Sequence, residues 1–248
     1  MKSWTTQKGH TITRILSGAA NAYFIRTDQF LLMVDTGTAS SFKRLKKNLA
    51  NLMGDHEKLD VLVLTHSHYD HCQNAARIRD AYQCKIVMGG EEASYTTKGF
   101  TPLPRGTFLF TRWLTALGNR IGPPKFGYEA FTPDLLIHED QPVDKKVPNI
   151  RAIKTQGHTM GSISLIIDQE VALVGDAMFG IFKNSIYPPF ADDKESMANS
   201  WNKLFQTGCR IFLPGHGRPV KRELIRKKLS HTFRLLFLAG VFAMSMAA

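Results

Sequence analysis

The sequence predicts an α/β fold, an αββα sandwich in which two mixed sheets pack face to face and helices cover their outer sides. Stretches with helical and with strand-like hydrophobic spacing alternate along most of the 248 residues. Hairpin patterns also occur near the start of each half of the chain. Alternating helices and strands, together with hairpins in both halves, favour two packed sheets with helices outside.

The N-terminal part of the chain predicts an antiparallel start to a sheet and then a helix. Residues 11–35 read as three short strands separated by turn-forming residues. Apolar residues then recur at helical spacing over 42–52, with Ser40 and Ser41 as candidate N-caps. The hydrophobic period therefore changes from strand to helix between these two stretches.

The next stretch predicts a βαβ unit followed by an insertion. Residues 61–65 are apolar on both faces, as expected of a buried strand, 72–82 has a helical pattern, and 85–88 reads as another strand. Five prolines then interrupt 99–133 around a central apolar patch. We expect this stretch to be a lid-like insertion over the sheet edge rather than a separate domain.

The second half predicts a further sheet with its own helices. Strand-like runs occur at 150–155, 162–168, 171–175 and 210–214. A helix with one apolar face is expected after Asp193, and a basic helix from Val220. With 43% hydrophobic residues the chain can bury one substantial core, so we expect a single domain over 1–234.

Residues 235–248 form an uncharged, apolar C-terminal tail that follows a basic stretch. These fourteen residues are fewer than the roughly 20 that a membrane-spanning helix needs. We expect a segment that packs on the domain or remains poorly ordered. The alternative is a weak, shallow membrane contact.

The charge and cysteine content give expectations about the partners of the protein and its cellular compartment. Lys and Arg number 32 against 21 Asp and Glu, and this excess favours anionic partners, although much of it lies on predicted helix faces exposed to solvent. The three cysteines form no Cys-x-x-Cys pair, which favours free thiols in a reducing compartment. No apolar run at the N-terminus resembles a secretory signal. We therefore expect a cytoplasmic location.

The densest group of chemically active residues is the segment THSHYDH, which follows the apolar strand at 61–65. In an extended segment residues two apart face the same way, so His66 and His68 can bind one ion. Asp70 and His71, at the turn into the next helix, can face a second ion. Imidazoles and a carboxylate this dense are costly to bury without a metal. Three further candidates lie at predicted strand ends: His158 in QGHTMGS, Asp176 in VGDAMFG and His216 in LPGHG.

The ordered set DTG, THSHYDH, GHTMGS, GDAMF and PGHG resembles the two-metal branch of the metallo-β-lactamase superfamily, from about residue 10 to about residue 217. The resemblance implies the fold of that family and two metal sites. One ion would be held by His66, His68 and His158, the other by Asp70, His71 and His216, with Asp176 bridging both. Asp35, in the DTG motif, would accept a hydrogen bond that orients a ligand histidine.

This ligand set predicts hydrolytic chemistry. Nitrogen and oxygen donors with two carboxylates suit two divalent ions, with zinc favoured and iron or manganese as alternatives. Closely spaced ions can share a hydroxide that attacks the substrate, and Asp70 is a candidate for catalytic proton transfer. The leading hypothesis is hydrolysis of a small ester, thioester or lactone with an anionic group. The alternatives are a two-metal phosphodiesterase or nuclease, which the basic charge favours, and a non-catalytic metal-binding scaffold.

Substrate contacts are expected from the two segments that would overhang the metals. The candidates are Phe179, Phe182, Lys183 and Tyr187, which follow Asp176, and Trp113 in the insertion. An apolar wall with one lysine would suit a small acyl compound that carries an anionic group.

Overall fold

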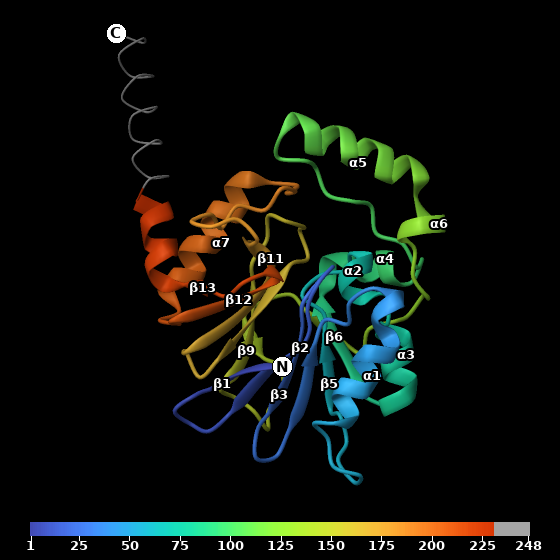
Figure 1. The fold of residues 1–248 in the computed structure, drawn as a ribbon, viewed down its shortest axis with the longest axis vertical. Helices are drawn as coiled ribbons and strands as arrows, with labels where there is room; N and C mark the ends of the chain where they lie inside the picture. Colours follow the sequence, from blue (N-terminus) through green and yellow to red (C-terminus); the bar gives the residue numbers. More distant parts are fainter. Residues whose placement is uncertain (231–248) are drawn as a thin grey trace.

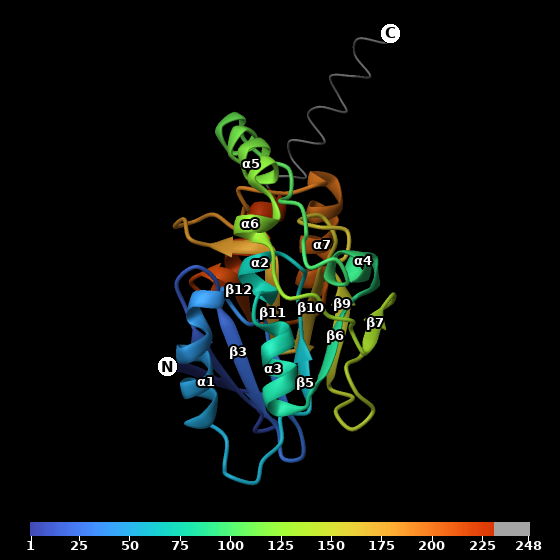
Figure 2. The same ribbon diagram turned by 90° about the vertical axis from the view of Figure 1, so that its right-hand side faces the viewer.

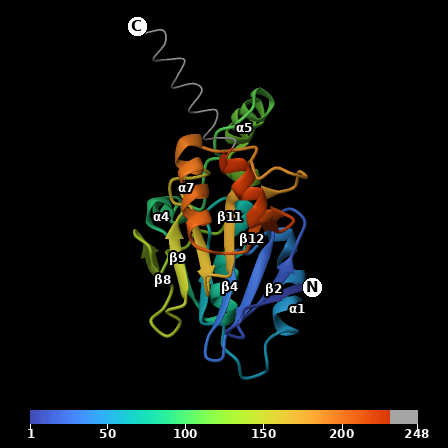
Figure 3. The same cartoon turned by 90° about the vertical axis from the view of Figure 1, so that its left-hand side faces the viewer.

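The protein forms four layers, arranged helix–sheet–sheet–helix (Figure 1). The computed structural model describes residues 1–230, and the predicted apolar tail at 235–248 lies outside the described residues, as do the last residues of the predicted domain. Figure 2 shows the helices on the outer side of the first sheet, and Figure 3 shows those on the outer side of the second. The predicted αββα sandwich is confirmed.

The first sheet has seven strands, and their order in space follows their order in the chain. The strands are β1 (Lys2–Thr5), β2 (Thr11–Leu16), β3 (Ala22–Arg26), β4 (Leu31–Val34), β5 (Val61–Val63), β6 (Lys85–Gly89) and β7 (Leu135–Ile137). The pairs from β1 to β4 are antiparallel, whereas β4 to β7 pair in parallel. The carboxyl ends of β4, β5 and β6 therefore meet at one edge of this sheet.

The second sheet has six strands. In spatial order they are β13 (Val220–Lys221), β12 (Ile211–Gly217), β11 (Val171–Gly180), β10 (Ile163–Ile167), β9 (Ile150–Lys154) and β8 (Gln141–Pro142). The pairing of β11 with β12 is parallel, and the other pairs are antiparallel. The adjacent carboxyl ends of β11 and β12 thus lie side by side.

The helices lie outside the sheets or in the connections between strands. They are α1 (Phe42–Ala50), α2 (Tyr69–Cys72), α3 (Ala75–Tyr82), α4 (Ala93–Thr96), α5 (Leu109–Ile121), α6 (Pro123–Phe126) and α7 (Lys194–Gln206), with the short 3₁₀ turns η1 (Ala39–Ser41) and η2 (Gly90–Glu92). Residues 222–230 are also helical. Among residues 1–230, no helix combines the length and apolar character needed to cross a membrane.

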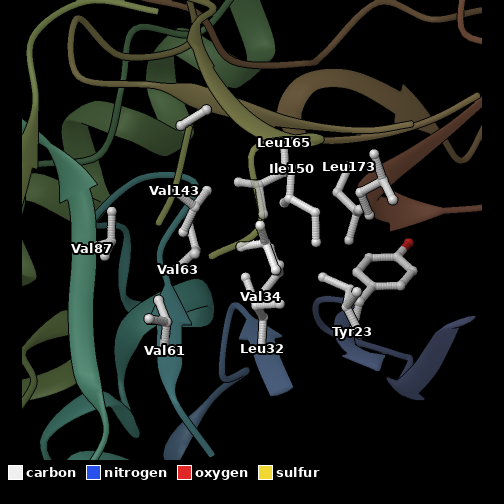
Figure 4. Packing of buried hydrophobic residues seen from close by; sticks show 14 of the residues in the cluster. Tyr23, Leu32, Val34, Val61, Val63, Val87, Val143, Ile150, Leu165 and Leu173 are labelled. Atoms are coloured by element: carbon white, nitrogen blue, oxygen red, sulfur yellow. The ribbon is translucent and has the colours of Figure 1, made fainter. Parts of the chain in front are cut away.

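Three apolar clusters hold the layers together. One lies between the sheets, where side chains such as Val34, Val63 and Leu165 from the two sheets point toward one another (Figure 4). A second joins the first sheet to α1 and α3, and a third joins the second sheet to α7 and the helical residues 222–230. Strands covered on both faces lose the alternation of polar and apolar residues. This explains why every residue of β4 and β10 is buried.

The helix predicted over 72–82 corresponds to α3, which begins only at Ala75, and Cys72 is the last residue of α2. Asn74, the N-cap residue of α3, donates side-chain amide hydrogen bonds to the backbone oxygens of Thr36 and Thr38. Asn74 therefore ties the start of α3 to the loop after β4, at the edge where the histidines lie. Ser41 takes the N-cap position of α1 as predicted, but its hydroxyl donates to Thr38 O instead of capping the helix.

The stretch predicted as an insertion, 99–133, contains α5 and α6. Helix α5 projects from the body of the protein at one end, beyond the edges of the sheets (Figures 1 and 2). The connection that leads to it holds it in place, since Thr115 donates a hydrogen bond to Pro104 O and Asn119 exchanges hydrogen bonds with the backbone of Leu103. Whether the stretch acts as a lid remains a prediction.

Candidate metal centre

The backbone around THSHYDH divides its four polar side chains into two pairs. His66 and His68 lie in the extended segment after β5, and His68, at φ −65° and ψ 146°, is the N-cap of α2. Asp70 and His71 lie in the helix itself. The change from extended to helical backbone therefore separates the pairs, as the sequence predicts.

The structure brings all seven predicted metal ligands together from distant parts of the chain. Their potential ligand atoms form three overlapping groups, within each of which all atoms lie within 4.8 Å of one another. The groups are His66 with His68 and His158, His66 with His71 and Asp176, and Asp70 with His71 and His216. The first and third groups are the two ligand sets that the family resemblance implies, apart from the bridging Asp176.

Asp176 lies between the two outer groups. Its Oδ1 is 3.3 Å from His71 Nε2, and its Oδ2 is 3.5 Å from His158 Nε2 and 3.3 Å from His216 Nε2. Burial by itself would raise the pKa of this carboxyl, but the charges of His216, His71 and His158 lower the pKa well below its usual range. The Oδ2 of this carboxylate therefore lies close to one histidine of each outer group.

The buried polar atoms of the cluster fit a metal ion. His66 Nε2, His68 Nε2 and Asp176 Oδ1 are buried and have no hydrogen-bond partner. Burial lowers the pKa of both His66 and His68 well below the usual value, so each imidazole keeps a lone pair free to bind a metal. Buried polar atoms are costly without a partner, and nitrogen and oxygen ligands suit a divalent transition metal. The cluster therefore binds divalent metal.

Asp35 lies directly behind one of the histidines. Its Oδ2 accepts a hydrogen bond from His71 Nδ1 at 2.8 Å, and its Oδ1 accepts one from Thr65 N at 2.8 Å. With its proton on Nδ1, His71 presents the lone pair of Nε2 to the other ligands. Asp35 therefore lies where the sequence predicts it, next to a candidate ligand and outside the cluster.

Close backbone approach is needed at two glycines of the second sheet. Gly175 has φ +48°, and a Cβ there would lie 2.6 Å from Thr65 Cβ. A Cβ on Gly215 would lie 2.5 Å from His71 Cε1 and closer still to Asp176 Oδ1.

Both strands continue past these glycines, so Asp176 and His216 lie within β11 and β12 rather than at the predicted strand ends. The irregular pairing of β11 and β12 around Gly175 is what lets Asp176 turn toward the histidines.

A cleft of about 180 Å³ opens onto the metal cluster. It is lined by His68, Tyr69, Asp70, Leu103, Pro104, His158, Asp176, Phe179, Phe190 and His216. Of the predicted substrate contacts, Phe179 lines this cleft, and its ring stacks on His216 with 4.7 Å between the ring centres.

The other predicted substrate contacts lie elsewhere. Phe182 and Lys183 are exposed in the loop after β11, Tyr187 packs against Trp201, and Trp113 stacks on Phe110 at the surface of α5. None of the four lines the cleft: Phe190 represents the loop after β11 there, and α5 points its large side chains outward. Their role in substrate binding stays a prediction. The sequence did not indicate Leu103, Pro104 and Phe190, whose proline-rich segments showed only irregular structure.

A buried carboxyl next to the ligands also escaped the sequence analysis. Glu92 is 2% exposed, and its Oε2 accepts a hydrogen bond at 2.7 Å from the backbone of Ser67, the residue between His66 and His68. Burial raises the pKa of Glu92 to about 6. The signal that indicated the ligands also applies here, since Glu92 follows the end of β6 at the same edge of the sheet. Through its hydrogen bond with Ser67 N, Glu92 holds in place the extended segment that carries His66 and His68.

Glu92→Gln should change how stability depends on pH. In the folded protein Glu92 has a pKa of about 6, against a reference value of 4.5, so it stabilises the fold below pH 4.5 and this contribution is lost as pH rises through 6. Glutamine does not ionise. The free energy of unfolding of the variant, minus that of the wild type, should therefore rise by about 2 kcal/mol between pH 4 and pH 7. Urea unfolding at the two pH values measures it.

The neighbouring Glu91 provides the control. Burial opposes its ionisation, but its ion pair with Lys154 lowers its pKa, so Glu91→Gln should lose stability relative to the wild type as pH rises through the acidic range. Parallel pH profiles for the wild type and Glu92→Gln would show that Glu92 does not carry a raised pKa.

Comparisons with known proteins agree with this architecture. The family model described as the metallo-beta-lactamase superfamily matches residues 17–216. The chain is 27% identical over 232 residues to "Probable metallo-hydrolase YflN" of Bacillus subtilis, covering 85% of each chain. It is 24% identical over 203 residues to "Probable metallo-hydrolase MJ0888" of Methanocaldococcus jannaschii, covering 80% of this chain and 88% of the relative. A third relative, "Atrochrysone carboxyl ACP thioesterase" of Aspergillus fumigatus, is 23% identical, with 93% of this chain and 65% of the relative covered.

Solved structures share the fold. A metallo-beta-lactamase superfamily protein of the archaeon Sulfolobus tokodaii aligns with a TM-score of 0.63 at 20% identity, covering 90% of this chain and 86% of that one. The subclass B3 metallo-beta-lactamase BJP-1 of Bradyrhizobium japonicum aligns with a TM-score of 0.65 at 18% identity, covering 98% and 96%. At these sequence identities the structural similarity shows that the fold is shared and shows nothing about function. Because the family model spans most of the chain, including every predicted ligand, the protein belongs to the metallo-beta-lactamase superfamily of metal-dependent hydrolases.

Proposed function

We propose that the protein binds two divalent ions, with zinc favoured, and hydrolyses a small ester, thioester or lactone. The observation that carries the proposal is the composition of the cleft. Its floor is the ligand cluster, and its walls include Leu103, Pro104, Phe179 and Phe190. A small apolar cleft over a metal centre suits an acyl group whose carbonyl lies at the metals.

The ligands divide between the two ions as the family resemblance implies. His66, His68 and His158 would hold one ion, Asp70, His71 and His216 would hold the other, and Asp176 would contribute to both. When bound, the two ions supply Lewis-acid polarisation of the scissile carbonyl and activation of water. The ring of His158 is oriented by its Nδ1, which donates a hydrogen bond to Phe190 O at 2.9 Å, so that its Nε2 faces the other ligands, 3.0 Å from His68 Nδ1.

Two side chains at the cleft are suited to handle protons and orient the substrate. Asp70 lines the cleft with Oδ2 3.4 Å from His216 Nε2, and its carboxylate is placed to take a proton from water and return it to the leaving group. Tyr69 also lines the cleft, and its phenol, which is protonated at neutral pH, can donate a hydrogen bond to the substrate.

A thioester substrate has some support from the comparisons, since one relative is named as a thioesterase acting on an acyl carrier protein. The phosphodiesterase alternative rests on the net charge of +11. Among the described residues that line the cleft, however, none is Lys or Arg, whereas enzymes that bind phosphodiesters use such cations to neutralise phosphate. We therefore favour a small acyl compound over nucleic acid.

The test combines metal analysis with a substrate panel. Reconstituted protein should bind two ions per chain and should turn over lactones or thioesters faster than bis-p-nitrophenyl phosphate. Turnover by wild type but not by an Asp176→Ala preparation would exclude a contaminating hydrolase. Saturation at one ion contradicts the two-metal assignment, and faster phosphodiester cleavage that falls with salt favours the nuclease. Two bound ions without turnover of any substrate would favour the scaffold.

A further inference from the structure

Helix α5 is amphipathic, but it buries a face of small residues and exposes its large apolar side chains to solvent. The residues that it buries are Thr111, Thr115 and Gly118, and its large side chains point outward. Leu109 is 84% exposed, and Phe110 and Trp113 follow at 68% and 60%. A helix on a globular protein normally buries its apolar stripe, and exposed apolar patches of this kind mark interaction surfaces.

The exposed apolar surface extends beyond these residues. Leu117 and Ile121 continue it along α5, while Ile181 and Phe182 are exposed in the loop after β11. That loop is tied to the start of α5, because Thr107 N donates a hydrogen bond to Pro189 O at 2.9 Å. We call the exposed large apolar residues of α5 the apolar face; they are Leu109, Phe110, Trp113, Leu117 and Ile121.

The chain segment that carries the apolar face has charge of one sign. Residues 93–128 contain five basic residues and no acidic residue. Arg112 and Arg120 lie on α5 itself and are exposed. A second copy of the chain would bring these like charges together, whereas an anionic surface would pair with them.

The end of the described chain also carries basic residues. Residues 222–230 run toward the end of the protein at which α5 lies (Figures 1 and 3). The sequence after Glu223 contains four basic residues and no acidic residue, and 235–248 is uncharged and apolar.

We propose that α5 is an interfacial helix that docks the protein on an anionic membrane surface. The apolar face enters the boundary between headgroups and acyl chains, and Arg112 and Arg120 contact lipid phosphates. Leu103 and Pro104, in the connection that leads into α5, line the cleft, so docking holds the cleft close to the membrane. The proposal does not depend on which bond the enzyme hydrolyses.

Flotation of the full-length protein with vesicles tests it. The wild type should float with phosphatidylcholine vesicles that contain phosphatidylserine and much less with phosphatidylcholine alone. Phe110→Ser combined with Trp113→Ser, and separately Arg112→Glu combined with Arg120→Glu, should each weaken binding about tenfold or more. The matched control is Lys43→Glu with Lys47→Glu, which makes the same charge change on exposed positions of α1 and should bind as the wild type does. Circular dichroism and thermal unfolding check that each variant is folded.

Tryptophan fluorescence locates the contact. Of the three tryptophans, Trp113 is 60% exposed, Trp4 is partly buried against the core and Trp201 is 3% exposed, so a blue shift on adding anionic vesicles should disappear in Trp113→Phe while flotation persists. Flotation of both α5 variants at the wild-type level would overturn the proposal, as would an equal loss in the α1 control. Self-association that the α5 variants abolish, without vesicle binding by the wild type, would identify a second copy of the chain as the partner and overturn it too.

Discussion

Asp176→Ala is expected to abolish metal binding at both sites and to lower kcat/KM by about a thousandfold or more, since metal ions supply several kcal/mol of transition-state stabilisation. The carboxylate of Asp176 lies within 3.5 Å of His71, His158 and His216, so its removal takes away the one side chain placed next to both outer groups and leaves these three imidazoles without their common partner. Elemental analysis after dialysis, together with steady-state turnover, measures the two effects.

Two further variants distinguish bridging from simple damage. His216→Ala should mainly weaken one ion, because His216 belongs to one of the ligand groups. Asp35→Ala removes an orienting hydrogen bond and no ligand, so it should cost about 10- to 100-fold in metal affinity. An Asp176→Ala protein that retains two ions and full activity would disprove the bridging role.

Gly215→Ala should impair the metal centre although it removes no ligand. The added methyl would lie 2.5 Å from His71 Cε1 and closer to Asp176 Oδ1, so both side chains would have to move. Metal coordination tolerates shifts of roughly 0.2 Å, and misplacement by about 1 Å can cost about a hundredfold in rate. We expect a loss of that size in kcat/KM, with weaker metal retention against a chelator.

Gly54→Ala is the matched control for this prediction. A Cβ on Gly54 meets nothing closer than 3.7 Å, and that atom belongs to the side chain of Glu57. This variant should bind metal and turn over substrate as the wild type does. If Gly215→Ala behaves like Gly54→Ala, the ligands are not packed as tightly against β12 as the structure indicates.

The packing around Gly215 also explains how the last histidine is positioned. Asn21, just before β3, donates a backbone hydrogen bond to Gly215 O and a side-chain hydrogen bond to Pro214 O, and the Tyr23 hydroxyl donates to Pro214 O. These hydrogen bonds from the first sheet fix the position of β12 next to the ligand cluster. The sequence contained no sign of this, because the contacts join residues about 190 positions apart.

The sequence by itself identified the seven side chains that the structure brings together, and it predicted how the four in the first motif divide into pairs. Local backbone geometry decides that His66 and His68 face one way and that Asp70 and His71 follow on a helix, so a short motif carries that information. The αββα architecture could also be predicted, because burial on one or both faces leaves a periodic signal in each strand and helix.

Only the tertiary structure decided the surroundings of those ligands. The sequence predicted Phe182, Lys183, Tyr187 and Trp113 beside the metals, yet the structure lines the cleft with Leu103, Pro104 and Phe190 and buries Glu92 behind the first two histidines. These placements depend on how irregular segments fold over the sheet edges and pack against distant residues. Such segments have no hydrophobic period, so their positions follow from long-range contacts and not from local sequence.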